Sequence, residues 1–510
     1  MTTERYDIII IGTARAAARW PMHSRRPEKK ILLLERGDYL PRERENWSTE
    51  AVFKQKRYQA HETWYYNGTP FRPEINYWVG GNTKLFGAAM FRLREADFGE
   101  IRHAGGISPA WPVEYDVFAP YYTQAEQLYH VHGERGIDPT EPPADAPYPH
   151  PPLRHEPRII QLKDDLEKLG YRPFPLPMGI RLSEQRGDSP VYHSTFDGYP
   201  DLTESKADAH VICVKPALTH TNVTLLCNRL VWKLVTDASG RTVTEVHARH
   251  NGETEVYRTD LVIVAAGAAN SAAIFLRSAN DQHPHGLANR SGLLGRNYIC
   301  HNNATFVAIS KQPNASIFQK TLAMSDWYGP SADWEYPMGL IQMLGKVDET
   351  LMAFESPQPL GDMSYAEMAA YSLDFWLQSE DLPDPENRIT INQAGEIELQ
   401  YNANNLEAYE RLTAKLRSLL GSIGCHDRMI PVDYYLGTRF PFNLAHQAGT
   451  MRFGTDPATS VLDVNCKPHD LDNVYVTDAA FMPSIGAVNP SLTIIANTLR
   501  VADHLKAEVR

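Results

Sequence analysis

The chain has 510 residues, of which 43% are hydrophobic and 22% are charged, and its formal net charge at pH 7 is −12. This length allows two or more domains around a large core. The acidic balance excludes a dedicated nucleic-acid binder, because a phosphate backbone requires a basic face, and no run of residues is apolar for long enough to span a bilayer.

The chain enters an apolar run, Tyr6 to Ile11, almost at once. The charged start and the apolar core of roughly 7–15 residues that mark a signal peptide are missing. The five cysteines are scattered and show no metal-ligand spacing. We therefore expect a cytoplasmic protein with reduced thiols and no metal site.

A βαβ unit is predicted at the start of the chain. Asp7 to Gly12 is typical of a buried parallel strand that ends in a glycine turn, and Ile31 to Glu35 is typical of a second strand. The residues between them leave room for one crossover helix. Glu35 then stands where the acid of a dinucleotide-binding fingerprint accepts hydrogen bonds from the adenosine ribose. The alternative interpretation of Glu35 is a strand end at the surface.

The glycine pattern of this fingerprint is altered. Ala14 and Ala17 stand where glycines are expected, and Pro21 falls inside the predicted helix, at a cost of roughly 3 kcal/mol. Restoring one base after the codon of Thr13 lets the following codons read Gly-Ala-Gly-Gly-Gly-Thr-Leu-Ala, which is a well-formed fingerprint. A compensating shift near Lys29 returns the frame. We hypothesise that residues 14–29 derive from paired frameshifts; if this segment is genuine, cofactor affinity is weakened.

Further elements follow along the chain. Gly136 to Pro157 is rich in proline and predicts an extended connector. Leu261 to Gly267 predicts another apolar strand that meets a glycine turn, and Asn473 to Asp478 predicts a fourth strand. Leu406 to Leu420 has apolar residues at helical spacing, which indicates an amphipathic helix.

Three segments resemble signatures of one known family. Val79-Gly80-Gly81-Asn82-Thr83-Lys84-Leu85-Phe86-Gly87 is similar to the flavin-contacting loop of the glucose–methanol–choline (GMC) oxidoreductases. The segment from His446 to Pro457 resembles the first catalytic segment of the family, and the segment from Asn473 to Leu505 resembles its C-terminal signature. The resemblance spans nearly the whole chain and is weakest at about 150–200 and 305–435.

The resemblance implies an α/β fold of the GMC and p-hydroxybenzoate-hydroxylase type. A Rossmann-like FAD-binding domain is expected to collect residues 1–105, 205–305 and 436–510. A discontinuous substrate domain, built on an antiparallel sheet, is expected to collect residues 106–204 and 306–435. The substrate would bind where the two lobes meet.

The resemblance also implies oxidation of an alcohol to a carbonyl. His446 is the expected base, since histidine titrates near neutrality, and Asn489 is expected to hydrogen-bond the substrate oxygen as charge develops on it. Asn489-Pro490 also predicts a helix start, with Asn489 as the N-cap and proline as the first helical residue. An asparagine at this position resembles the pyranose oxidases and choline oxidases, so a sugar or glycoside hydroxyl is the expected substrate.

The implied cofactor is noncovalent FAD, because the loop from Asn82 to Phe86 lacks the histidine that attaches FAD covalently in some relatives. The residues expected to contact FAD are Gly12, Thr13, Glu35, Arg36, Gly81, Asn82, Thr83, Val231, Ala266, Gly267, Asp478, Ala479, Pro490 and Ser491.

Several alternatives stay open at the level of sequence. Gln378 and Glu380 are weak candidates for contacting sugar hydroxyls, and a solvated loop is the preferred interpretation of both. The chain is alternatively a lyase that retains FAD without redox turnover, or a cofactor-poor inactive homologue with an altered glycine loop. Oxygen, a quinone and a protein are all open as the electron acceptor. The oligomeric state is open as well.

Overall fold

The computed structural model describes residues 4–13, 29–182, 195–355, 359–425, 430–432 and 446–508. The crossover helix predicted between the first two strands lies outside the described residues. So do residues 14–28, which make up almost all of the segment assigned to a frameshift.

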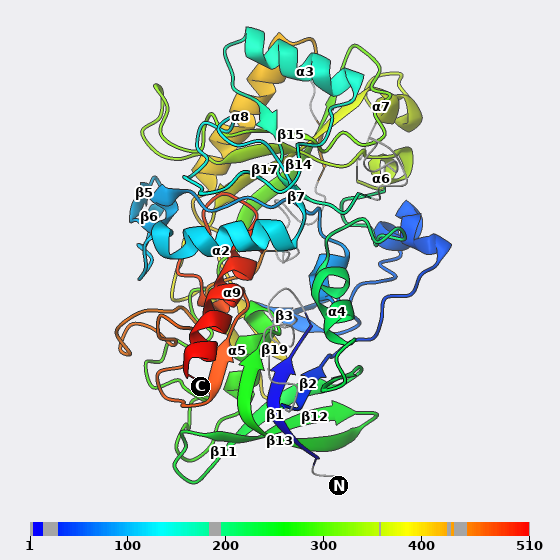
Figure 1. Ribbon diagram of the computed structural model, residues 1–510. Coiled ribbons are helices and arrows are strands. Elements are labelled where there is room, and N and C mark those ends of the chain that lie inside the picture. The colour runs from blue at the N-terminus through cyan, green and yellow to red at the C-terminus, as the bar shows by residue number, and fades with distance from the viewer. Residues whose placement is uncertain are drawn as a thin grey trace.

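A mostly parallel sheet builds one half of the molecule (Figure 1). Its strands are β1 (Glu4–Ile11), β2 (Ile31–Leu34), β10 (Val223–Leu226), β11 (Leu230–Thr236), β12 (Val243–His250), β13 (Glu253–Val264) and β21 (Val474–Val476). The order is β10-β2-β1-β13-β12-β11, and β21 also pairs with β13. Strands β1, β2, β10 and β21 run parallel to their neighbours, whereas β11 and β12 are antiparallel.

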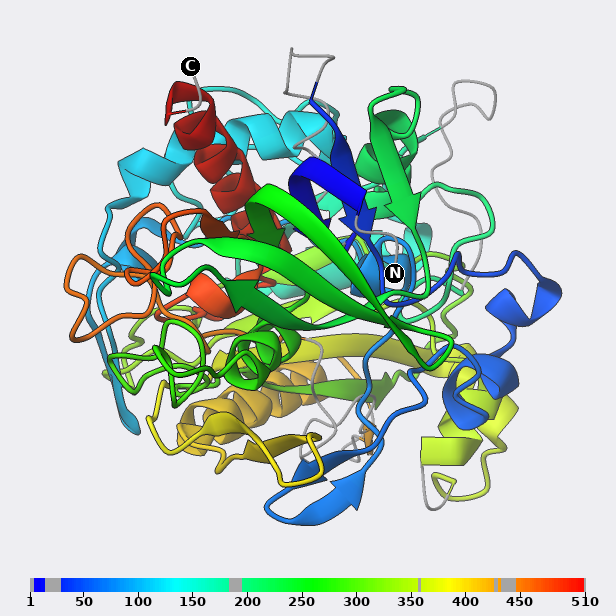
Figure 2. The ribbon, with the colours of Figure 1, turned by 90° about the horizontal axis from the view of Figure 1, so that it is seen from below.

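The predicted strands of this sheet are confirmed, although their bounds differ, most of all in β13. Strand β13 begins at Glu253 rather than Leu261, because its first half pairs with β12 as a hairpin. The exposed and buried residues of that half alternate, so it lacks the continuous apolar run of a strand covered on both faces. Figure 2 shows β11 to β13 in front when the molecule is seen from below.

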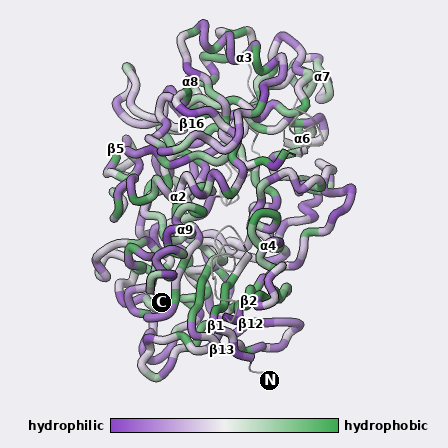
Figure 3. Tube along the Cα trace, viewed as in Figure 1, coloured by the Kyte–Doolittle hydropathy of each residue, from purple (hydrophilic) through white to green (hydrophobic). Residues whose placement is uncertain are grey.

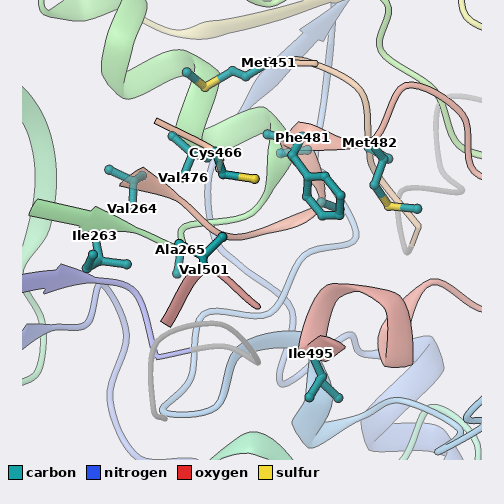
Figure 4. Close-up of a cluster of buried hydrophobic side chains, with 14 of the residues drawn as sticks. Ile263, Val264, Ala265, Met451, Cys466, Val476, Phe481, Met482, Ile495 and Val501 are labelled. Atoms are coloured by element: carbon teal, nitrogen blue, oxygen red, sulfur yellow. The ribbon is translucent and has the colours of Figure 1, made fainter. Parts of the chain in front are cut away.

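Helices α2 (Tyr115–Leu128), α5 (Ala268–Arg277) and α9 (Ser491–Glu508) pack around this sheet, and the short helix α4 (Lys215–Ala217) lies near it. Helix α2 packs on α9, and α5 packs on β11. Their shared core includes Ile263 and Val264 of β13, Val476 of β21, and Ile495 and Val501 of α9 (Figure 4). The same region of strands stands out as hydrophobic along the Cα trace (Figure 3).

A six-stranded antiparallel sheet builds the other half, in the order β20-β14-β17-β16-β15-β8. Its strands are β8 (Phe174–Pro175), β14 (His301–Ile309), β15 (Leu322–Met324), β16 (Leu340–Met343), β17 (Ser372–Glu380) and β20 (Ile430–Val432). One face packs against helices α3 (Pro157–Lys168) and α8 (Leu406–Ser422). The amphipathic helix predicted from Leu406 is thereby confirmed.

The two faces of this sheet differ because side chains alternate along each strand. Ala304, Phe306 and Ala308 of β14 face the core beneath α3 and α8. Val307 and Ile309 belong to a separate core with α6 (Glu349–Glu355) and α7 (Tyr365–Tyr371). The second face therefore also carries His301 and Asn303, which precede Val307 at the same two-residue period.

A smaller four-stranded sheet has the order β18-β19-β3-β4. It consists of β3 (Trp64–Tyr66), β4 (Thr69–Phe71), β18 (Arg388–Ile391) and β19 (Ile397–Gln400). Strand β3 pairs with β19, so this sheet joins segments that the sequence analysis assigned to different domains. The domain boundaries stay a prediction.

The remaining strands form two short pairs, β5 (Ile101–His103) with β6 (Gly106–Ser108), and β7 (Val131–His132) with β9 (Met178–Gly179). The proline-rich residues 136–156 contain neither a helix nor a strand, and α3 starts directly after them. Within the described parts of the chain, no helix has the length and apolar content needed to cross a membrane.

Candidate active site

A cleft lies at the carboxyl ends of β1, β2 and β13, where α/β sheets bind their ligands. All residues predicted to contact FAD line this cleft except Pro490 and Ser491. Ser491 lines a neighbouring cavity, and Pro490 lines neither of the two. The structure thus gathers residues from β1, the double-glycine loop, β13 and the C-terminal segment around one space.

Glycine is required at two turns of the cleft. Gly12 has a φ angle of +90°, and a Cβ at this position would lie 2.5 Å from the carbonyl oxygen of Ala265. Gly267 has a φ angle of +91° at the start of α5. Residues with a side chain rarely adopt such angles. Both turns therefore depend on glycine.

Glu35 is buried, with 5% of its surface exposed, so the alternative interpretation of a surface strand end is wrong. Its carboxylate accepts hydrogen bonds from the backbone N–H of Thr13 and of Gly37, both at 3.0 Å, and from the Thr13 hydroxyl. Burial raises the pKa of Glu35, and these hydrogen bonds oppose the increase. The hydroxyl of Thr13 also accepts from the N–H of Gly80, at 2.9 Å, and so ties the first glycine turn to the double-glycine loop.

Asp478 connects the other side of the cleft. Its carboxylate accepts from the N–H of Gly267 and from the N–H of Ala480, both at 3.0 Å. Burial raises the pKa of Asp478, whereas its hydrogen bonds lower it. This side chain therefore fixes the turn after β13 against the C-terminal segment.

Several residues that line the cleft were not predicted from the sequence, among them Tyr77 and Gln447. Arg36 stacks on the ring of Tyr77, with 3.9 Å between the guanidinium carbon and the ring centroid, and Glu62 forms an ion pair with Arg36. Gln447 also lines the cleft, and its buried Nε2 has no acceptor among the described residues. No family motif marks Tyr77, although Gln447 stands directly beside the predicted base.

The neighbouring cavity holds both predicted catalytic residues, His446 and Asn489. Asn76 and Asn82 line this cavity and the cleft, so the two spaces meet. The cavity is otherwise lined by residues that the sequence analysis did not select, among them Phe86, Asp197, Lys320, Gln342, Leu344 and Trp376. Lys320 and Asp197 form an ion pair at 2.5 Å.

His446 is held by a second histidine that the sequence analysis missed. The Nδ1 atoms of His446 and His301 are 2.9 Å apart, and Nε2 of His301 lies 2.9 Å from the carbonyl oxygen of Gly486. The amide nitrogen of Gln378 is farther from this Nε2, at 3.3 Å. Burial lowers the pKa of His301 to about 4, so its ring is neutral at pH 7 and carries a single proton.

Asn489 is held by a side chain of the antiparallel sheet. Nε2 of Gln342 donates to Oδ1 of Asn489 at 2.8 Å. Helix α9 begins at Ser491, and its first hydrogen bond runs from the N–H of Ile494 to the carbonyl of Pro490. The predicted helix start is therefore displaced by one residue, with Pro490 rather than Asn489 at the cap position.

The interpretation of Gln378 and Glu380 as residues of a solvated loop is wrong. Both lie on the central strand β17 and are buried. Glu380 accepts from the N–H of Gly486 at 3.0 Å and contacts His103 at 3.2 Å. Burial alone would raise the pKa of Glu380, but the hydrogen bond and charge of His103 lower it overall. These residues support the site from behind, because neither lines the cavity.

Two family models match the chain, both described as GMC oxidoreductase, at residues 167–303 and 428–498. The second match contains His446 and Asn489, and the first contains Gly267 and His301. The chain belongs to the GMC oxidoreductase family. It is therefore an oxidoreductase, and the family resemblance seen in the sequence is confirmed.

Curated relatives extend along nearly the whole chain. The 6'''-hydroxyparomomycin C oxidase of Streptomyces lividus is 27% identical over 99% of this chain and 92% of its own length. The paromamine 6'-oxidase of Streptomyces fradiae is also 27% identical, over 98% of this chain and 90% of its own length. The fructose dehydrogenase large subunit of Gluconobacter japonicus is 23% identical over 99% of this chain and 98% of its own length.

Solved structures share the fold. A formate oxidase variant from Aspergillus oryzae superposes with a TM-score of 0.69 at 15% identity, over 100% of this chain and 99% of the other. The pyridoxine 4-oxidase of Mesorbium loti superposes with a TM-score of 0.63 at 18% identity, over 98% of this chain and 99% of the other. The predicted α/β architecture of the GMC type is confirmed by these neighbours and by the two sheets.

Proposed function

We propose that this GMC oxidoreductase binds FAD noncovalently and oxidises a hydroxyl group of a sugar or amino sugar to a carbonyl. The observation that carries the proposal is the meeting of two spaces at Asn76 and Asn82. One is a cleft lined by a glycine turn and a buried acid, and the other is a cavity that contains His446 and Asn489. The names of the relatives that act on paromamine, 6'''-hydroxyparomomycin C and fructose support the substrate class.

The residues of the cleft fit FAD. Gly12 forms the tight turn with which a dinucleotide fingerprint begins, since a Cβ there would lie 2.5 Å from the carbonyl oxygen of Ala265. Glu35 stands at the end of β2, where an acid of this fold accepts from ribose hydroxyls. The buried Nε2 of Gln447 needs an acceptor, and a flavin ring offers carbonyl oxygens and ring nitrogens. When bound, FAD supplies the acceptor for the hydride that leaves the substrate carbon.

The attachment is proposed to be noncovalent. The loop Gly81–Lys84 forms a short 3₁₀ helix at the junction of the two spaces, and no histidine lies between Gly81 and Phe86. Asn82 and Thr83 line the cleft instead. Amide and hydroxyl groups of this kind hydrogen-bond a cofactor without forming a bond to it.

His446 is proposed to take the hydroxyl proton. The carbonyl of Gly486 can only accept, so the single proton of neutral His301 lies on Nε2 and its Nδ1 is an acceptor. The proton of His446 is then required on Nδ1, where it is donated to His301. This tautomer leaves the basic lone pair of His446 on Nε2, the nitrogen that acts as the general base.

Asn489 is proposed to stabilise the substrate oxygen. Its Oδ1 accepts from Gln342, so its Nδ2 is the end of the amide that can donate within the cavity. A donor beside the reacting oxygen stabilises the negative charge that develops as the proton leaves. Base and donor come from separate segments, which meet in one cavity.

The absorption spectrum of the purified protein, before and after acid precipitation, tests the cofactor. We expect flavin bands that move into the supernatant on precipitation. Flavin that stays with the pellet would contradict noncovalent attachment. A colourless protein would contradict FAD binding and support the cofactor-poor homologue.

Anaerobic mixing with paromamine, D-fructose or D-glucose tests the reaction. We expect at least one of the three to bleach the flavin absorbance, because oxidation of the substrate reduces the cofactor. A yellow protein that none of the three bleaches would contradict sugar oxidation and support a lyase that retains FAD.

A further inference from the structure

Gln342 carries a buried amide of which only the nitrogen end is hydrogen-bonded to a described residue. The residue lies on β16 and is 1% exposed. Its Nε2 donates to Oδ1 of Asn489 at 2.8 Å, but within the described parts of the chain no group donates to its Oε1. A buried acceptor without a donor is destabilising, so native structures rarely keep one unless a ligand or a water supplies the hydrogen bond.

The pleat of the antiparallel sheet directs this amide into the cavity of His446 and Asn489. Ile341 and Met343, the neighbours of Gln342 along β16, pack in the core beneath α3 and α8. Gln342 therefore faces the opposite side, where it lines the cavity. Trp376 is its cross-strand partner on β17 and lines the same cavity.

The contact between the two amides fixes what each offers to a ligand. Because Gln342 donates, Asn489 keeps a donor at Nδ2 and Gln342 keeps an acceptor at Oε1. The opposite orientation of both amides would place an oxygen lone pair of Asn489 beside the reacting oxygen, where negative charge develops. The observed orientation thus presents one donor and one acceptor side by side.

We propose that Gln342 is a substrate-binding residue whose Oε1 accepts a hydrogen bond from a second hydroxyl or ammonium group of the substrate. The proposal rests on the proposed function and narrows its substrate class to alcohols that carry a further donor group. A monohydric alcohol would leave the buried Oε1 without a donor, and a site of this kind rejects such analogues strongly. The apolar wall formed by Trp376, Phe86 and Leu344 then contacts the carbon skeleton.

Binding without turnover tests the proposal. Dissociation constants of paromamine, D-fructose and D-glucose are measured under anaerobic conditions by isothermal titration calorimetry, on FAD-loaded protein whose flavin has been reduced beforehand, so that no hydride can be transferred. Three variants are compared with the unsubstituted chain. Gln342→Met removes both ends of the amide at similar length, and Gln342→Glu keeps an oxygen acceptor whether its carboxyl is charged or neutral. Gln282→Met is the matched control, because Gln282 lies on an exposed loop outside both cavities.

We expect Gln342→Met to weaken binding of the tightest sugar by about 10-fold or more, as loss of a buried hydrogen bond does. Gln342→Glu should stay within about threefold of the unsubstituted chain, and Gln282→Met should be unchanged. A role of Gln342 in packing alone would leave Gln342→Met close to the unsubstituted chain, because methionine has a similar length. Equal affinity of Gln342→Met and the unsubstituted chain would overturn the proposal, as would an unsubstituted chain that binds none of the three sugars.

The proposed function and the proposed role of Gln342 can be contradicted independently of each other. If a sugar binds, and Gln342→Met weakens that binding, but no sugar bleaches the flavin, then Gln342 binds a ligand as proposed and sugar oxidation is wrong. If a sugar bleaches the flavin and Gln342→Met binds it as tightly as the unsubstituted chain, oxidation stands and the role of Gln342 is wrong.

Discussion

The Nδ1 atoms of His301 and His446 lie 2.9 Å apart, and His301 is bound at its other nitrogen by the carbonyl of Gly486. The N–H of Gly486 is bound in turn by Glu380 at 3.0 Å. A buried carboxylate thus holds the backbone of Gly486, the carbonyl of Gly486 holds a neutral histidine, and this histidine orients the proposed base. The orientation of His446 depends on residues that do not line the cavity.

Substitution of His301 should slow the reaction without removing the cofactor. In His301→Leu the Nδ1 proton of His446 loses its acceptor, so we expect the rate of flavin reduction to fall about 10- to 100-fold, the equivalent of one buried hydrogen bond. KM should change little. His301→Gln should recover part of the rate, because its side-chain oxygen can accept from His446. Stopped-flow absorbance measures the rate of flavin reduction in both variants. An unchanged rate in His301→Leu would refute the inference that His301 orients His446.

The same histidine should make stability depend on pH. Its pKa is about 4 in the folded chain and about 6.5 when unfolded. Between these values the unfolded chain binds a proton that the folded chain does not, so the free energy of unfolding falls as pH falls from about 6.5 to about 4. The full loss is roughly 3 kcal/mol, of which roughly 2 kcal/mol arises between pH 7 and pH 5.

Urea unfolding at pH 7 and pH 5 measures this effect. The fall in the free energy of unfolding should be smaller in His301→Gln than in the unsubstituted chain by about that amount, whatever the stability of the variant at pH 7. An identical pH dependence in both proteins would show that His301 does not titrate between its folded and unfolded values.

Replacing the proposed base should abolish most of the reaction. We expect His446→Ala to lower the rate of flavin reduction by about 10²- to 10⁴-fold, which is the usual contribution of a general base. The flavin content should remain, since His446 lines the cavity and not the cleft. His469→Ala is the control, because His469 contacts Ser460 outside both spaces. Full activity in His446→Ala would rule out this residue as the base.

Gly12→Ala should reduce both FAD retention and stability. The new Cβ would lie 2.5 Å from the carbonyl oxygen of Ala265, at a φ angle of +90°. We expect a loss of about 1–3 kcal/mol of stability and a flavin-to-protein ratio below that of the unsubstituted chain. Gly421→Ala is the control, because it lies in α8 and a Cβ there meets no atom within 4 Å. If Gly12→Ala retains as much flavin as the control, FAD binding does not require glycine at this turn.

The hypothesis of paired frameshifts concerns residues 14–29. Tandem mass spectrometry of tryptic peptides from the protein made by the source organism should give the glycine-rich reading after Thr13. We expect Gly-Ala-Gly-Gly-Gly in place of Ala14-Arg15-Ala16-Ala17-Ala18. A peptide that matches Ala14 to Lys29 as printed would dismiss the hypothesis, and flavin affinity would then be expected to be weakened.

The sequence alone determined the elements whose signal is local. The apolar runs of β1 and β2 and the helical spacing of α8 predict strands and a helix, because burial of one continuous segment leaves a periodic pattern. The cleft was predictable for the same reason. Gly12, Glu35 and Asp478 stand at the ends of such strands, within contiguous motifs, and the carboxyl ends of parallel strands meet at one edge of the sheet.

Only the tertiary structure decided which residues surround His446 and Asn489. His301, Gln342 and Glu380 lie on three strands that are far apart in the sequence, and no motif marks them. Their face is set by the register that pairs His301 with Glu380 and Gln342 with Trp376. A shift of one residue in this pairing would turn every one of these side chains to the opposite face. Register is fixed by burial across the whole sheet, so a short stretch of sequence does not contain it.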